Sequence, residues 1–146
     1  MRTPASFRSS WPSLAVALLV ACTGSGKREA AALTDAVDRF RAANTEASRT
    51  ATVESLTALA CSDAKVCDAK RTCVEAIEPT AMALSLKDQV TLKLADLEAA
   101  RLAPDASEAQ ALPATLDEAS RLLREGHKKM DECDTKLTDL RVTFGF

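Results

Sequence analysis

Cysteine is the residue type that offers this chain the most chemistry. The five cysteines are Cys22, Cys61, Cys67, Cys73 and Cys133, and thiolates can bind metal ions, form disulfides or act as redox centres. The last four follow a Cys-x5-Cys-x5-Cys pattern with a distant fourth member, whereas structural zinc sites usually leave about two to four residues between paired ligands. Cysteines at this spacing on one helix also point in different directions. The spacing therefore predicts a disulfide framework rather than a metal site or a Cys-x-x-Cys redox motif.

The other polar residues do not form a recognisable catalytic set. His127 is the only histidine, so no arrangement that requires a second histidine can be assembled. Adjacent acids such as Asp117 and Glu118, or Asp131 and Glu132, would fan apart on a helix surface. We therefore predict a protein that is not an enzyme and that has no cofactor and no bound metal.

The run Gly24-Ser25-Gly26-Lys27 is a weak match to a phosphate-binding loop. That motif requires Gly where Ala21 stands and Ser or Thr where Arg28 stands, on a turn from a strand to a helix. Both positions differ and no strand pattern precedes them, so we predict no nucleotide binding.

The elements that must position these residues are predicted to be helices. Alanine is abundant, glycine is almost absent after Gly26, and β-branched and polar residues do not alternate as they would in strands. The chain after residue 21 holds 17 basic and 21 acidic residues, and its aromatic residues are Phe40, Phe144 and Phe146. This mildly acidic, aromatic-poor composition argues against nucleic-acid binding.

Apolar periodicity predicts three helical segments. The first covers about residues 28–60, where weak helix formers between Asn44 and Thr52 predict a kink or a short break. The second covers about residues 63–102, and Pro79 predicts either a bend or a division into two shorter helices. The third has the clearest pattern, with Pro113 in its first turn and apolar or small residues at alternating steps of four and three. These are Leu112, Leu116, Ala119, Leu123, Gly126, Met130, Cys133, Leu137 and Leu140.

Three long segments joined by short turns predict an all-α protein, an antiparallel three-helix bundle stapled by disulfides. In a hairpin of two helices, residues that are symmetric about the turn face each other. A turn near residue 103 places Cys133 opposite Cys73, and a turn near residue 63 places Cys61 opposite Cys67. We predict the disulfides Cys61–Cys67 and Cys73–Cys133, which would compensate for the small apolar area that alanine side chains bury.

The N-terminal segment has the three parts of an export signal. Basic residues stand near its start, residues 14–21 form an apolar run about half as long as a transmembrane helix, and Ala21 is a small residue directly before Cys22. The sequence Leu19-Val20-Ala21-Cys22 resembles the lipobox of bacterial lipoproteins. This resemblance covers about the first twenty residues, and it implies that residues 1–21 are removed and that Cys22 is lipidated. In a simple secretory signal, the alternative, Cys22 would be an ordinary residue.

The resemblance divides the chain into a signal peptide over residues 1–21, a lipidated Cys22 with a flexible tether over 22–27, and a helical bundle domain over 28–146. It implies a protein that is anchored in a bacterial cell envelope and faces the periplasm. Thr23 in place of an Asp after the cysteine favours the outer membrane over the inner membrane. Two acyl chains would hold such a protein stably, whereas one chain would hold it only marginally.

The predicted function is that of a non-enzymatic, lipid-anchored module that has a structural role or binds a protein partner. The rings of Phe144 and Phe146 either cap the end of the bundle near the disulfides or form an exposed tip that this partner contacts. The alternative is an envelope protein that binds a small ligand or a metal ion in pockets between helices or through free thiols. The partners expected on the first hypothesis are the membrane, through Cys22, and an unidentified protein.

Overall fold

The structure, a computed structural model, describes residues 22–146, and the predicted signal peptide lies outside this range. As predicted, the described part is all-α. Its helices are α1 (Cys22–Ala42), α2 (Glu46–Ala58), α3 (Ala64–Glu98), the one-turn α4 (Ser107–Gln110) and α5 (Leu112–Phe144). No helix of this part combines the length and the apolarity that a membrane crossing requires.

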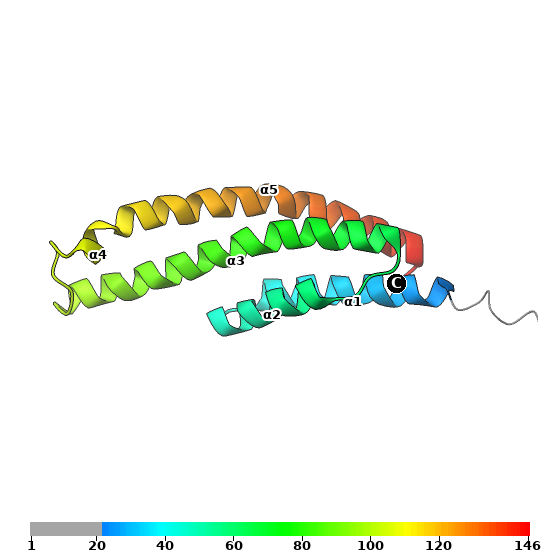
Figure 1. Ribbon diagram of the computed structural model, residues 1–146, viewed down its shortest axis with the longest axis horizontal. Coiled ribbons are helices and arrows are strands. Elements are labelled where there is room, and N and C mark those ends of the chain that lie inside the picture. Colours follow the sequence, from blue (N-terminus) through cyan, green and yellow to red (C-terminus); the bar gives the residue numbers. More distant parts are fainter. Residues whose placement is uncertain (1–21) are drawn as a thin grey trace, which may run out of the picture.

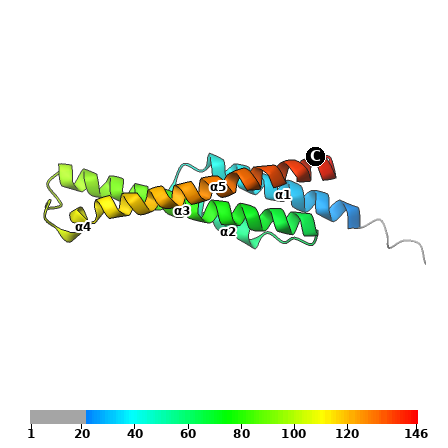
Figure 2. The ribbon, with the colours of Figure 1, turned by 90° about the horizontal axis from the view of Figure 1, so that it is seen from above.

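The long helices α3 and α5 form a hairpin that runs the length of the molecule (Figures 1 and 2). α1 and α2 form a second, shorter hairpin beneath the half in which α3 begins and α5 ends. We call that end of the molecule the base, and it also carries the start of α1 and the C-terminus. The rest of the long hairpin, residues 89–123 including α4, extends beyond α1 and α2. We call it the arm.

The structure differs from the predicted three-helix bundle, because the segment predicted as one helix over residues 28–60 is two helices. α1 ends at Ala42 and α2 begins at Glu46. The Thr45 hydroxyl accepts a hydrogen bond from the backbone N–H of Ser48 at 3.2 Å, and the Ser48 hydroxyl accepts one from the backbone N–H of Thr45 at 3.3 Å. This reciprocal capping box starts a new helix. The break that the weak helix formers predict is therefore a complete reversal of the chain.

Residues 22–27 are predicted to form a flexible tether. In the structure they form the first turns of α1. Gly26 is buried, and a Cβ atom there would lie 2.8 Å from Cε1 of Phe144. Lys27 Nζ donates a hydrogen bond to the carbonyl oxygen of Gly145 at 2.7 Å. The absence of a side chain at Gly26 lets the start of α1 pack beneath the end of α5.

Two prolines mark the long hairpin. α3 continues through Pro79, although proline cannot donate the helical hydrogen bond. α5 has Pro113 in its first turn, where the missing N–H group leaves no helical bond unmade. α3 ends at Glu98, and Ala100 follows with a φ of 55°, a left-handed conformation that turns the chain away from the helix axis.

Glu29 links α1 to the start of α3. Its carboxylate accepts hydrogen bonds from the backbone N–H of Ser62 at 2.8 Å, from the Ser62 hydroxyl at 2.6 Å, and from the backbone N–H of Asp63 at 3.2 Å. The hydrogen bonds from Ser62, and then the one from Asp63, lower the pKa of the Glu29 carboxyl. Asp63 in turn caps α3 by accepting from the N–H groups of Lys65 and Val66. The base is thus tied together by polar contacts at its rim.

The hydrophobic core lies between the two hairpins, and all four long helices contribute to it. Ion pairs join the helices at its edge: Arg41 of α1 with Asp134 of α5, Arg49 of α2 with Asp88 of α3, and Lys136 of α5 with Asp68 of α3. In the arm the buried residues are Val90, Leu112, Ala119 and Leu122, which form a narrow seam between α3 and α5. The core cluster comprises Ala30, Leu33, Ala36, Val37, Phe40, Leu56, Val66, Ala69, Cys73, Ala76, Ile77, Cys133, Leu137 and Leu140.

Candidate functional site

The cysteines at positions 61, 67, 73 and 133 are all in disulfides. Cys61 is bonded to Cys67 and Cys73 to Cys133, and these are the pairs that the geometry of the hairpins predicts. The second bond is fully buried between α3 and α5. A sulfur in a disulfide is not a thiolate, so these side chains do not offer metal ligands or nucleophiles in this state. Within residues 22–146, no group of three or more His, Cys, Asp and Glu side chains lies close enough to hold a metal ion.

The histidine and the adjacent acids considered as candidates for proton exchange face the solvent. His127 and the acid pairs considered above, Asp117 with Glu118 and Asp131 with Glu132, are all exposed. The pKa of the Glu118 carboxyl is lowered because Arg121 donates to it at 2.7 and 2.8 Å. A shift of this kind belongs to a surface ion pair and does not indicate a buried general acid or base.

The two terminal phenylalanines have different surroundings. Phe144 is half-buried, packs against the core cluster and lies over Gly26. Phe146 is 40% exposed. The structure therefore places Phe144 as a cap on the base, which was one of the two arrangements expected, and leaves the ring of Phe146 accessible beside the start of α1.

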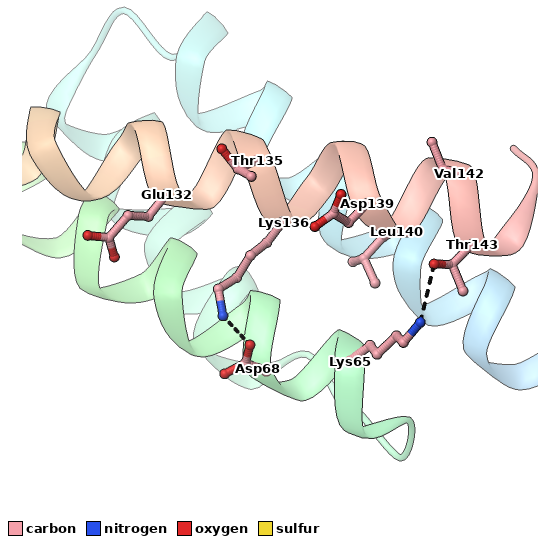
Figure 3. Close-up of a pocket in the computed structure, with 9 residues that line it drawn as sticks. All are labelled: Lys65, Asp68, Glu132, Thr135, Lys136, Asp139, Leu140, Val142 and Thr143. Carbon is pink, nitrogen blue, oxygen red and sulfur yellow. Dashed lines mark hydrogen bonds and ion pairs between the residues drawn. The ribbon is translucent and has the colours of Figure 1, made fainter.

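An open groove of about 630 Å³ lies at the base between α3 and α5 (Figure 3). Lys136 reaches across it to pair with Asp68, and Lys65 Nζ donates to the Thr143 hydroxyl at 3.5 Å. The hydrogen bond from Lys136, followed by that from Arg71, lowers the pKa of the Asp68 carboxyl. The groove is lined by Lys65, Asp68, Glu132, Thr135, Lys136, Asp139, Leu140, Val142 and Thr143. Its charges are of both signs and partly paired.

Three leucines of the arm have exposed side chains. Leu92 is 68% exposed, Leu94 is 46% exposed and Leu116 is 41% exposed. A shallow depression of about 300 Å³ lies beside α4, where Lys93 of α3 pairs with Glu108 at 3.7 Å. Exposed leucines at the end of a hairpin without covering helices form a candidate contact surface for another protein.

One stripe of apolar residues on α5 passes from the covered half into the arm. Leu137, Met130, Leu123 and Leu116 are seven residues apart, so they lie along one side of the helix. Leu137 and Met130 pack in the core that α1 helps to form. Leu123 is half-buried and Leu116 is exposed. α1 ends at Ala42, next to the ion pair of Arg41 with Asp134, and the long hairpin extends beyond this end (Figure 1). The arm therefore continues the surface that α1 covers nearer the base.

The sequence pattern placed Leu116 on an inward-facing seam and did not reveal its exposure. The heptad spacing identifies the side of α5 on which Leu116 lies, but it carries no information on how far a neighbouring helix reaches. The signal that would have revealed it is the helix start at Thr45–Ser48, since a reversal there shortens α1.

Comparisons with models of protein families, with curated proteins and with solved structures give no match to this chain. The fold therefore defines the class of this protein by its architecture alone. It is an all-α protein with a disulfide-linked base and a projecting helical hairpin.

Proposed function

We propose that this chain is a non-enzymatic lipoprotein of a bacterial cell envelope, anchored through Cys22, that binds a protein partner along its arm. The lipobox residues Leu19-Val20-Ala21-Cys22 support the anchor. The two disulfides support an oxidising compartment outside the cytoplasm, where such bonds persist. Thr23 supports the outer membrane, with the domain facing the periplasm.

The binding role is supported by the apolar stripe on α5. This stripe packs against the core at Met130 and extends through Leu123 to the exposed Leu116. Nearer the base the same side of the hairpin is filled by α1, which contributes Leu33, Val37 and other apolar residues to the core. In the arm, the same stripe could be covered by a helix of the partner that has apolar residues at steps of three and four. This helix would lie beyond the end of α1 and cover the stripe there as α1 does nearer the base.

The anchor is tested by the intact mass of the protein purified from its own membranes, with thiols alkylated before any reduction. We expect a chain that starts at Cys22, carries the mass of added acyl groups and has no alkylated cysteine. A chain with residues 1–21 removed and an unmodified Cys22 would contradict lipidation. An alkylated cysteine at position 61, 67, 73 or 133 would contradict the disulfides in the native protein.

The binding role is tested by placing a photoreactive benzoyl-phenylalanine at Leu116 and irradiating intact cells. We expect a discrete adduct whose cross-linked peptide, identified by mass spectrometry, belongs to an amphipathic helix of another protein. The matched control carries the same group at Val142, which is 80% exposed but lies at the base. Leu94→Asp, a charge on the arm outside the buried seam, should abolish the adduct and leave the circular dichroism unchanged.

Three results of the same experiment would contradict the binding role. They are an adduct with a second copy of this chain, an equal yield from positions 116 and 142, and the absence of any adduct at position 116. The first would identify the arm as a contact between identical subunits, and the other two would remove the arm as a specific surface.

A further inference from the structure

The cationic side chains of this protein are paired unevenly along its length. Nine arginines and lysines of the described residues pair with acids, among them Arg41 with Asp134 and Lys129 with Glu75, whereas Lys70, Lys87, Arg124 and Lys128 are exposed or half-buried without an ion pair. At the base, Lys27, Arg28, Lys65 and Arg141 are all exposed, and in the described residues none of them lies within ion-pair distance of a carboxylate. Their hydrogen bonds, where present, go to neutral oxygens.

Two acids at the base, Glu29 and Asp63, accept hydrogen bonds from the start of α3. Glu29 accepts from the N–H groups of Ser62 and Asp63, and Asp63 caps α3 by accepting from Lys65 and Val66. These carboxylates interact with the N–H groups at the start of α3, where the helix dipole is positive. Asp139 lies on α5 two residues before Arg141, is exposed, and lines the same groove as Lys65. The base therefore presents four exposed cations that belong to no ion pair of the described residues, beside the exposed carboxylate of Asp139.

Two apolar side chains accompany the cations. Val142 is 80% exposed and Phe146 is 40% exposed, and Figure 3 shows Val142 pointing away from the helices. Lys27 and Phe146 lie at the junction of α1 and the C-terminus, because Lys27 binds the carbonyl oxygen of Gly145. We call Lys27, Arg28, Lys65, Arg141, Val142 and Phe146 together the basal face. Exposed cations beside an exposed ring and an aliphatic side chain are the composition of surfaces that rest on lipid headgroups.

The residues before Cys22 also indicate that a membrane lies against the basal face. The apolar run over residues 14–21 leads directly into Cys22, the first residue of α1, so it joins the folded part at the base. A bilayer that holds either an acyl group on Cys22 or the apolar run itself is adjacent to the basal face. The tip of the arm is about 50 Å away, because α3 has 35 residues.

We infer that the basal face lies on the anionic headgroups of the membrane, so that the arm projects away from the bilayer. This orientation deepens the proposed function, since it rests on the anchor and adds the surface that contacts lipid. An anchor with a flexible tether would leave the domain free to rotate. Here α1 begins at the anchored residue, and the basal face contacts the lipid headgroups. Together they fix the orientation of the domain, with the arm pointing away from the membrane.

Quenching of tryptophan fluorescence tests the orientation. Trp11 is the one tryptophan of the sequence, so replacing it allows a single new tryptophan to report on one position. In a Trp11→Phe background, Phe146→Trp reports on the basal face and Leu116→Trp on the arm. Each full-length protein is produced in bacteria, purified from its membranes and reconstituted into vesicles of phosphatidylethanolamine and phosphatidylglycerol with brominated chains. We expect bromine to quench the emission of Trp at position 146 and to leave that at position 116 unchanged.

Charge reversal separates the basal cations from the anchor. Lys27→Glu with Lys65→Glu should remove most of the quenching at position 146 while the protein stays bound to the vesicles. Lys87→Glu with Arg124→Glu changes the net charge equally at exposed positions away from the base, and it should leave the quenching as it was. Circular dichroism of both variants checks that the helices are intact.

The intact mass of the same preparations distinguishes failure of the inference from failure of the anchor. A lipidated protein with no quenching at position 146, or with equal quenching at 146 and 116, would overturn the upright orientation and leave the anchor standing. An unlipidated protein that still shows quenching only at position 146 would support the basal face and overturn the anchor. An unlipidated protein that does not bind the vesicles would overturn both.

Discussion

Replacing Cys73 and Cys133 together with alanine should lower the free energy of unfolding by roughly 4 kcal/mol. The disulfide closes a loop with a sequence separation of 60 residues, and both cysteines are fully buried in the core. Its loss frees a long stretch of the unfolded chain, which raises the entropy of the unfolded state. Urea denaturation of the oxidised wild type and of the double variant measures the change. For one domain with an alanine-rich core, this is a large share of a total that is typically about 5–15 kcal/mol.

The matched control is the double replacement of Cys61 and Cys67. That disulfide has a sequence separation of six residues, so its removal should lower the free energy of unfolding by roughly 2 kcal/mol. Equal losses from the two double variants would show that loop closure does not explain the stabilisation. A wild type whose urea midpoint is unchanged by reduction would show that neither bond contributes.

The Gly126→Ala variant should lose about 2–3 kcal/mol of stability, although alanine is the better helix former. An added Cβ would overlap the hydroxyl oxygen of Thr80 and would lie 2.9 Å from the carbonyl oxygen of Ala76. The threonine side chain can rotate, but the carbonyl belongs to the backbone of α3 and cannot. The methyl group must therefore push α3 and α5 apart at the middle of the long hairpin. Thermal and urea denaturation measure the loss.

Two further variants isolate the cause of this effect. Gly24→Ala makes the same chemical change where no other atom would lie within 4 Å of the new Cβ, so it should be neutral or stabilising. Adding Thr80→Ala to Gly126→Ala should recover part of the loss, because it removes one of the two obstructing groups and leaves the Ala76 carbonyl. A Gly126→Ala protein as stable as the wild type would contradict the close approach of α3 and α5 at this residue.

Sequence reasoning succeeded where a residue's neighbours are set by the symmetry of a hairpin. Cys73 and Cys133 are equidistant from the turn between α3 and α5, and Cys61 and Cys67 lie on either side of the cap at Asp63, so both pairs could be read from spacing. Gly126 could be recognised as a point of close approach because it occupies a core position of an otherwise unbroken heptad pattern.

The errors arose where tertiary contacts decide the local structure. Gly24 and Gly26 suggest a flexible tether by composition, yet the ring of Phe144, more than a hundred residues away, packs over Gly26. The reversal at Thr45 depends on the capping box and on packing of α2 against α3, which includes the buried Arg49 paired with Asp88. Neither contact leaves a periodic signal in the sequence.

The candidate surfaces were less predictable than the helices, because exposure depends on where a covering helix stops. Leu116 and Leu137 occupy equivalent heptad positions on α5, but one is exposed and the other is buried. The difference is the length of α1, which ends at Ala42. Phe146 could be singled out from the sequence because aromatic residues are so rare in the chain. Lys27 and Lys65 come close to the end of α5 only in the folded structure.

The position of the Cys73–Cys133 bond makes the arm a separable part of the molecule. Every residue of the arm lies inside the loop that this bond closes, and the core cluster at the base contains no arm residue. A peptide bond cut anywhere in the arm would therefore leave both pieces covalently joined through the base, with the base still packed. For the same reason, the hairpin could be lengthened or shortened by matched heptads in α3 and α5 without altering the end that carries the termini. The length of the arm is thus free to vary independently of the part that stabilises the fold.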